Sequence, residues 1–312
     1  MILSSKTIAA LICRTVCIVL MVLWADGICY SQTQTPVKLY HCMVDLEDPQ
    51  KNVMKKYNIE AAVLIDGRYI DPKNTGYIDS VSFAKAILTF FPRPADKGLG
   101  LLDLEDENYK SLRNEGRSKV PLSVALEQFI KMVRIAKNLR PNVKWSVYNI
   151  PYTTYYDKTD KWKSQQKFLD PLLKELDIFT PSLYDFYPAS VDWADDKAYF
   201  TENIRIALEL GHLYNKPVMP YIWNRWHDSN AKSGLLLIDE NEFEQDIRWI
   251  IQSRFENTTV TGLIWFDAHT DFYRIKPELK KQDNLKVGAR ENQTSVKVFD
   301  RYARLLTDIT NN

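Results

Sequence analysis

The feature that most constrains the fold is a regular alternation of short apolar segments with helical patterns. Each apolar segment is five to seven residues long and nearly continuous in apolar character, as expected of strands buried on both faces of a parallel sheet. The segments are residues 39–44, 61–65, 98–102, 143–148, 178–184, 217–223 and 260–266. About seven strand–helix units without an obvious linker favour a closed barrel over a doubly wound open sheet. We therefore predict an α/β fold, a TIM-like (β/α) barrel.

The segments between these strands have the spacing of amphipathic helices. Apolar residues recur every three or four positions at Leu122, Leu126, Phe129, Val133 and Ala136. Similar spacing occurs at 243–250 and near the C-terminus at 298–305. A helix over residues 202–210 is expected to end at Gly211, because glycine is a common helix C-cap. We expect these helices to cover the outside of the barrel.

The N-terminus has the pattern of a signal peptide. Lys6 precedes an apolar run over residues 7–24, and the small residues Ala25 and Gly27 suit cleavage after Gly27. A retained anchor is the alternative, because the run is nearly long enough to span a bilayer. We predict a signal peptide at 1–27 and one domain at 36–312. The mature protein is then secreted or extracytoplasmic and makes no membrane contact.

Charge and composition exclude several function classes. Removing residues 1–27, which carry Lys6, Arg14 and Asp26, leaves 39 basic and 39 acidic residues. This balance argues against a nucleic-acid partner. The chain has only 10 glycines and no glycine-rich phosphate loop, so we expect no nucleotide cofactor. With four cysteines, two of them inside the signal segment, the chain is not a disulfide scaffold. No feature indicates an oligomeric state.

Two carboxylates follow the third predicted strand directly. Asp103 and Glu105 are two residues apart, so an extended backbone places both side chains on the same face. In a parallel barrel, catalytic groups lie at the carboxyl ends of strands. Like charges placed together raise one another's pKa, which is what a general acid at neutral pH needs. The alternative for this stretch is a solvated loop that begins a helix.

Other acidic groups along the chain are weaker candidates. A second Asp-Leu-Glu-Asp at residues 45–48 also follows an apolar stretch, and we interpret it as a surface loop. Asp267, His269 and Asp271 alternate after a strand and could bind a metal. The motif His-Glu-x-x-His is absent, and the chain has four histidines in all, so we predict no catalytic metal.

Aromatic residues end several of the other predicted strands. They are Tyr148, Tyr184, Trp223 and Trp265. Such rings at the mouth of a barrel suit a sugar site, because they pack on the apolar face of a sugar while hydroxyl groups bond its polar edge. Each ring on its own is also consistent with ordinary core packing.

Taken together, these motifs resemble the hyaluronidase family of glycoside hydrolases, which has animal and venom members. Residues 98–105 are similar to that family's strand ending in Asp-Phe-Glu, with Leu104 in place of Phe. Residues 136–151, Pro181-Ser-Leu-Tyr184, residues 220–228 and Gly262-Leu-Ile-Trp265 resemble later family motifs, in the family's order. The resemblance implies a distorted barrel with about seven strands.

The resemblance also implies roles for individual residues. Glu105 would protonate the leaving oxygen and then activate water, and the substrate's own N-acetyl carbonyl would be the nucleophile. Asp103 would stay ionised, polarise the acetamido nitrogen and raise the pKa of Glu105. Tyr148 and Tyr184 would hydrogen-bond around the same group, Trp265 would wall the pocket, and Trp223 would contact substrate. The expected activity is endo-cleavage of a hyaluronan- or chondroitin-type polysaccharide without a cofactor or metal.

The sequence departs from the family pattern at several points. Asp106 and Glu107 replace the family's Arg-Trp, so a basic contact to an acidic polymer is missing. The family's structural disulfides have no cysteines here to form them. A catalytically silent barrel that binds a glycan or a protein therefore stands as the alternative function.

Overall fold

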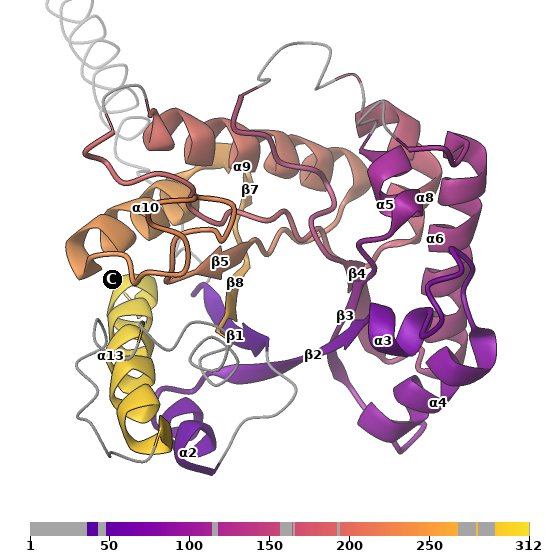
Figure 1. The fold of residues 1–312 in the computed structure, drawn as a ribbon, viewed down its shortest axis with the longest axis horizontal. Coiled ribbons are helices and arrows are strands. Elements are labelled where there is room, and N and C mark those ends of the chain that lie inside the picture. Colours follow the sequence, from indigo (N-terminus) through magenta and orange to yellow (C-terminus); the bar gives the residue numbers. More distant parts are fainter. Residues whose placement is uncertain are drawn as a thin grey trace, which may run out of the picture. The chain divides into compact units, whose positions relative to one another are not determined.

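Six parallel strands form a curled sheet at the centre of the fold, with helices around it (Figure 1). In their order across the sheet they are β4 (Val143–Val147), β3 (Gly98–Asp103), β2 (Glu60–Asp66), β1 (Lys38–Cys42), β8 (Gly262–Phe266) and β5 (Tyr221–Trp223). A short antiparallel hairpin, β6 (Arg254–Phe255) with β7 (Thr258–Thr259), precedes β8. The sheet is consistent with a distorted TIM-like (β/α) barrel, so the predicted fold class is confirmed.

The computed structural model describes residues 36–42, 48–113, 118–156, 164, 166–191, 194–267, 279 and 291–311. Residues 36–312 form one compact unit. The predicted signal peptide lies outside the described residues. Among the helices that are described, none is long and apolar enough to cross a membrane.

The segment predicted as the fifth strand forms isolated bridges instead of a regular strand. Phe179 pairs with Val218 and Ser182 with Tyr221, both in parallel, while Thr180 pairs with Ile150. Pro181 lies in the middle of the segment and has no N–H to donate to a ladder. The segment nevertheless runs between β4 and β5, which are the edge strands of the sheet, so the predicted strand count describes the barrel well.

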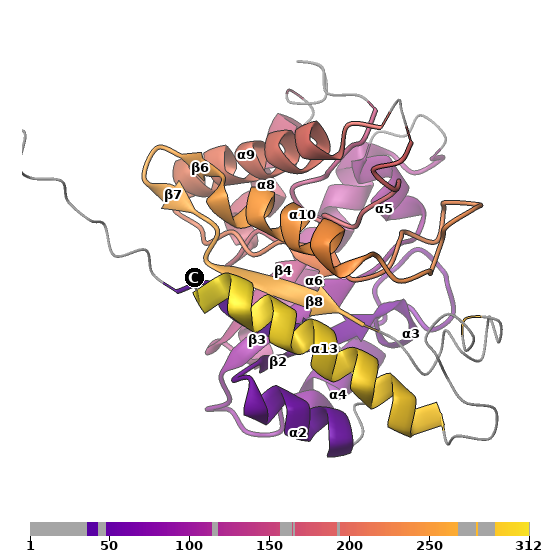
Figure 2. The same ribbon diagram turned by 90° about the vertical axis from the view of Figure 1, so that its left-hand side faces the viewer.

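The helices lie against the outer side of the sheet. They are α2 (Asp48–Lys56), α3 (Gly67–Ile70), α4 (Ser80–Phe90), α5 (Glu107–Leu112), α6 (Leu122–Leu139), the 3₁₀ turn η1 (Gln166–Leu169), α8 (Asp170–Glu175), α9 (Asp196–Tyr214), α10 (Glu240–Gln252) and α13 (Glu291–Asn311). Helix α13 packs against both α2 and α10 and runs beside β8 (Figure 2). The predicted amphipathic helices are therefore present.

One predicted helix end is wrong. Helix α9 passes through Gly211 and ends at Tyr214, where Asn215 takes the left-handed conformation with φ of 53°. Gly211 is needed for close packing, because a Cβ there would lie 2.6 Å from a methyl carbon of Val218 and 2.9 Å from the carbonyl oxygen of Lys216. Asparagine tolerates left-handed backbone better than most residues, so it can replace glycine as the cap.

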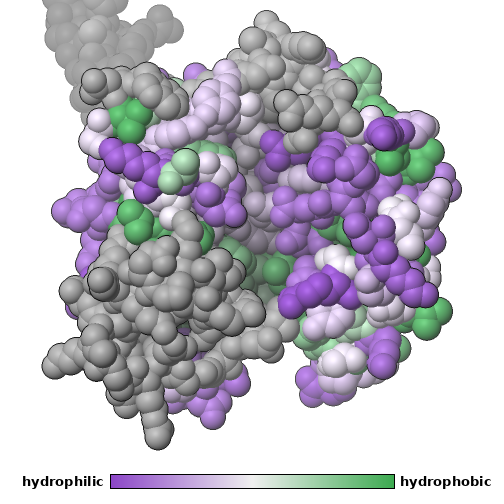
Figure 3. Space-filling model, viewed as in Figure 1, coloured by the Kyte–Doolittle hydropathy of each residue, from purple (hydrophilic) through white to green (hydrophobic). Residues whose placement is uncertain are grey.

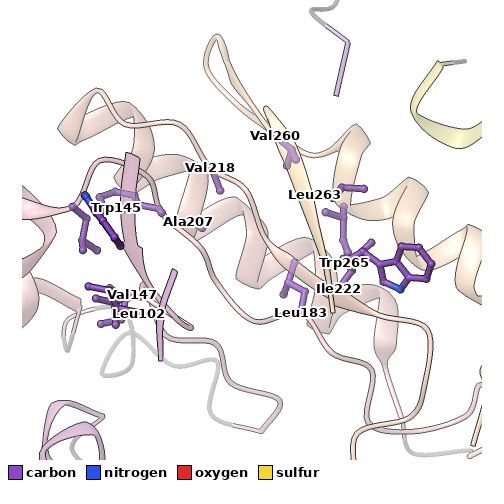
Figure 4. Close-up of a cluster of buried hydrophobic side chains, with 14 of the residues drawn as sticks. Leu102, Trp145, Val147, Leu183, Ala207, Val218, Ile222, Val260, Leu263 and Trp265 are labelled. Atoms are coloured by element: carbon purple, nitrogen blue, oxygen red, sulfur yellow. The ribbon is translucent and has the colours of Figure 1, made fainter. Parts of the chain in front are cut away.

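Side chains of each strand alternate between two hydrophobic cores. The inner core fills the barrel and includes Tyr40, Leu101, Tyr221 and Ile264. The outer core lies between strands and helices, and it includes the residues labelled in Figure 4: Leu102, Trp145, Val147, Leu183, Ala207, Val218, Ile222, Val260, Leu263 and Trp265. Because the side-chain period of a strand is two, the core that a residue joins fixes whether it can reach the barrel mouth.

Candidate active site

Asp103 and Glu105 lie at the carboxyl end of β3, on the inner side of the barrel. Leu101, two residues earlier, belongs to the inner core, whereas Leu102 and Leu104 pack in the outer core. The two acids therefore share the inward face, as the sequence predicts. Glu105 is exposed, while Asp103 is only partly exposed and its Oδ1 atom is buried without a hydrogen-bond partner among the described residues. Asp103 is therefore the more buried acid of the pair, and Glu105 is the more exposed one.

A third acid, which the sequence analysis did not single out, lies beside this pair. Asp66 ends β2 and pairs in register with Asp103 of β3. Its carboxylate forms an ion pair with Arg68, with Nε to Oδ2 at 2.9 Å and Nη2 to Oδ2 at 2.6 Å, and it accepts the Arg68 backbone N–H. Asp66 thereby caps α3 and faces the site as a paired charge.

The surroundings of Asp103 keep it protonated. Burial raises its pKa from 3.8 to about 8, and the negative charges of Glu105 and Asp66 add to the rise. Asp103 is therefore mostly neutral at pH 7 in the free protein. In the free protein this differs from the expectation that Asp103 is ionised and raises the pKa of Glu105. The reason is that burial raises the pKa of Asp103, whereas the side chain of Glu105 is exposed.

Tyr148 follows β4 and points toward the acid pair. Its hydroxyl is hydrogen-bonded to the Ser182 hydroxyl at 3.1 Å, and its ring lies 5.0 Å from that of Tyr221. Burial raises its pKa well above the ordinary value, with further contributions from the charges of Glu105 and Asp103. Tyr148 thus keeps its proton and can donate a hydrogen bond near both carboxyls.

Tyr184 and Trp223 complete an aromatic wall beside Tyr148. The Tyr184 ring lies 6.2 Å from Tyr148, 5.2 Å from Trp223 and 6.0 Å from Phe266. Both Tyr184 and Trp223 belong to the inner core and are buried. Five of the predicted site residues therefore lie at one end of the barrel: Asp103, Glu105, Tyr148, Tyr184 and Trp223. Their roles toward substrate stay predictions.

Trp265 does not lie with them. Its side chain is fully buried in the outer core, where it stacks on Phe299 of α13 at 4.6 Å and donates its indole N–H to Asn224 at 3.1 Å. Figure 4 shows it among the core side chains. The expectation that Trp265 walls the pocket does not match this placement. Phe266, the next residue, packs against the inner core instead.

Asn149 connects three parts of this end of the barrel. It adopts left-handed backbone with φ of 52°, which turns the chain directly after Tyr148. Its side-chain Nδ2 donates to the Tyr109 hydroxyl at 3.0 Å, and its side-chain Oδ1 accepts the backbone N–H of Ser182 at 3.1 Å. Asn149 therefore holds the partner of Tyr148 in place. Only its position next to a strand-end tyrosine could have pointed to it in the sequence.

The residues that depart from the family pattern have local structural roles. Asp106 is the N-cap of α5 and accepts the backbone N–H of Tyr109 at 3.0 Å. Glu107 pairs with Lys110 at 2.7 Å on the surface. The guanidinium of Arg113 lies over the Tyr109 ring at 5.7 Å. Burial raises the pKa of Tyr109, the positive charge of Arg113 opposes this rise, and the negative charge of Glu105 adds to it. The cation of Arg113 and the carboxylate of Glu105 thus both lie near Tyr109, although position 106 is acidic.

One face of the outer surface is mostly polar, and the described residues form no metal-binding group. On the face seen in Figure 3, hydrophilic residues cover most of the described surface, and hydrophobic residues lie deeper near its centre. Within the described part of the chain, no group of three or more acidic, histidine or cysteine side chains could hold a metal ion. His269, Asp271 and residues 45–47 lie outside the described residues.

Comparison with known proteins identifies solved structures of similar fold. The sequence matches no family model and no curated protein. The structure is similar to bee venom hyaluronidase, with a TM-score of 0.57 and 15% identity over 85% of this chain and 100% of that one. It is also similar to bee venom hyaluronidase in complex with a hyaluronic acid tetramer, with a TM-score of 0.54 and 15% identity over 78% of this chain and 97% of that one. The chain therefore shares the fold of these two structures.

Proposed function

We propose that this protein is a glycoside hydrolase that cleaves a hyaluronan- or chondroitin-type glycan at an N-acetylhexosamine. The observation that carries the proposal is the pair Asp103 and Glu105, which face inward at the carboxyl end of β3 beside Tyr148. The fold shared with bee venom hyaluronidase supports it. Export from the cytoplasm, directed by residues 1–27, is part of the same proposal.

In the proposed reaction, Glu105 donates its proton to the glycosidic oxygen as the bond from C1 to that oxygen breaks. The acetamido carbonyl oxygen of the same sugar attacks C1 and forms a cyclic intermediate. Glu105 then removes a proton from water, which attacks C1, opens the ring and restores the acetamido group. Configuration at C1 is retained, because it is inverted twice.

The single proton of the acid pair must move before the first step. In the free protein it resides on Asp103, whose pKa is raised to about 8. Substrate that covers Glu105 removes water from this carboxyl and raises its pKa, while an acetamido N–H donated to Asp103 favours the ionised form of Asp103. Substrate binding therefore transfers the proton to Glu105, where the leaving group needs it. Tyr148 keeps its proton and donates a hydrogen bond from its hydroxyl to the acetamido oxygen.

The alternative function is a catalytically silent barrel, and the sequence feature that supports it is the acidic pair Asp106 and Glu107. These residues act as a helix cap and as a surface ion pair, so their identity does not by itself disable the acid pair. A silent barrel would bind glycans and release no reducing ends.

The proposed mechanism predicts that hydrolysis requires the N-acetyl group. We expect reducing ends to be released from hyaluronan or chondroitin oligosaccharides, and release to fall by at least a hundredfold when the same oligosaccharides are de-N-acetylated, because the nucleophile is then absent. Colorimetric reducing-end release from matched pairs measures this. Equal rates on both members of a pair would rule out the acetamido group as nucleophile. If no reducing ends are released from any of these oligosaccharides, the alternative function, a catalytically silent barrel, would be favoured.

A further inference from the structure

An exposed tyrosine pair lies on the loops that follow β4 and the 178–184 segment. Tyr156 is 73% exposed, which is unusual for so large a ring, and its hydroxyl is hydrogen-bonded to the hydroxyl of Tyr187. A contiguous patch of exposed apolar surface marks a ligand-binding groove or another interaction site, whereas a single exposed ring does not. Because the hydroxyl contact joins two loops, both rings are held in position before any ligand arrives.

A continuous series of ring contacts leads from Tyr156 to the barrel mouth. Tyr156 contacts Tyr155 at 5.4 Å, and Tyr155 contacts Phe186 at 5.8 Å. Phe186 stacks on His227 at 4.6 Å, and His227 lies 6.2 Å from Tyr184 of the candidate active site. We refer to these five residues and Tyr187 as the aromatic strip. Apart from Tyr184, its members are partly or largely exposed.

Two buried acids lie next to the strip. Asp185 lies between Tyr184 and Phe186 and is 3% exposed, and Asp246 of α10 is 4% exposed. Burial, followed by the charge of Asp246, raises the pKa of Asp185 well above its ordinary value, and burial raises that of Asp246 to about 8. Both shifts favour the protonated form of these carboxyls, and a side-chain hydrogen bond links the two. Tyr155 is fixed separately, because its hydroxyl donates to Asp196 at 2.8 Å.

We infer that Tyr156 and Tyr187 form a distal sugar-binding subsite, and that a polymeric glycan lies along the aromatic strip between this subsite and the acid pair. The inference rests on the proposed function. Tyrosine suits this purpose because its ring packs on the apolar face of a sugar and its hydroxyl reaches the polar edge. A subsite remote from the cleaved bond adds binding energy only for substrates long enough to reach it.

The test compares Tyr156→Ala on long and short substrates. We expect kcat/KM for polymer of the cleaved glycan to fall roughly three- to tenfold more than kcat/KM for the shortest oligosaccharide cleaved, as one lost aromatic contact should cost. Tyr156→Phe keeps the ring and should retain most of the polymer rate. Leu213→Ala, which removes a 71% exposed apolar side chain at the far end of α9, is the matched control and should affect neither substrate.

The other outcomes of this test distinguish failure of the distal subsite from failure of the proposed function. An equal loss on long and short substrates, or no loss on polymer, would overturn the distal subsite while leaving the proposed function standing. If the wild-type protein cleaves no glycan, the proposed function fails, and affinity electrophoresis in gels containing hyaluronan or chondroitin takes over. Retardation of the wild-type protein that Tyr156→Ala weakens would then support the subsite, and unchanged or absent retardation would overturn it.

Discussion

Glu105→Gln is expected to lower the rate of reducing-end release by about a hundredfold to ten-thousandfold, the usual worth of general acid–base catalysis. Glutamine keeps the size of the side chain and accepts similar hydrogen bonds, but it has no proton to donate to the leaving oxygen. Because Glu105 is exposed in the free protein, the substitution should leave the melting temperature nearly unchanged. Initial rates on the best glycan of the panel, with circular dichroism for folding, measure both effects.

Glu107→Gln is the matched control for this variant. Glu107 lies two residues further along the chain, is exposed and pairs only on the surface with Lys110. Its replacement should change the rate by less than about twofold, since exposed ion pairs contribute little. A Glu105→Gln variant with wild-type rate would mean that the acid is elsewhere, and Asp66 would be the next residue to test.

Asp103→Asn is expected to lower activity by a factor similar to Glu105→Gln and, in contrast, to stabilise the fold. The pKa of Asp103 is about 8 when folded and near 3.8 when unfolded, so the unfolded chain binds fewer protons between these values. The contribution of Asp103 to wild-type stability therefore falls as pH rises from about 4 to about 8. Asparagine cannot ionise, so the variant's advantage should grow over that window, to on the order of 2 kcal/mol or about 4–6 °C at pH 8.

The pH dependence of kcat/KM provides a second readout. In the wild-type protein the acid pair needs one proton, so activity should fall as pH rises through about 8, where Asp103 loses it. The apparent pKa of this alkaline limb of the pH profile describes the coupled pair of carboxyls and not either residue alone. In Asp103→Asn the residual activity should depend on Glu105 alone, and the limb should move to lower pH. An unchanged limb, or a variant less stable than wild type at pH 8, would contradict the assignment of the proton to Asp103.

Much of the barrel could be predicted because strand burial leaves a strong pattern. Continuous apolar segments located all six strands of the sheet, and the period of two placed Asp103 and Glu105 on the inner face. The same period explains the error at Trp265. Ile264 and Phe266 alternate with it, so only one set can face inward, and the motif similarity outweighed the alternation.

Other features depend on contacts between distant segments. Asp66 becomes a neighbour of Asp103 through the register of β2 and β3, which neither strand reveals alone. The proton on Asp103 reflects burial of one carboxyl beside an exposed one, and two acids on one strand look equivalent in the sequence. The aromatic strip likewise joins loops that follow different strands, so its continuity appears only in the folded chain.

The anomeric configuration of the first product is the most direct test of substrate-assisted hydrolysis by the Asp103–Glu105 pair. Proton NMR can record it in the first minutes of cleavage of an N-acetylated oligosaccharide, before mutarotation equilibrates the anomers. The mechanism predicts that the newly formed reducing end appears first as the β anomer, the configuration of the bond that was cleaved. An α anomer formed first would mean that water attacks C1 directly, and it would contradict the acetamido nucleophile and the roles given to both carboxyls.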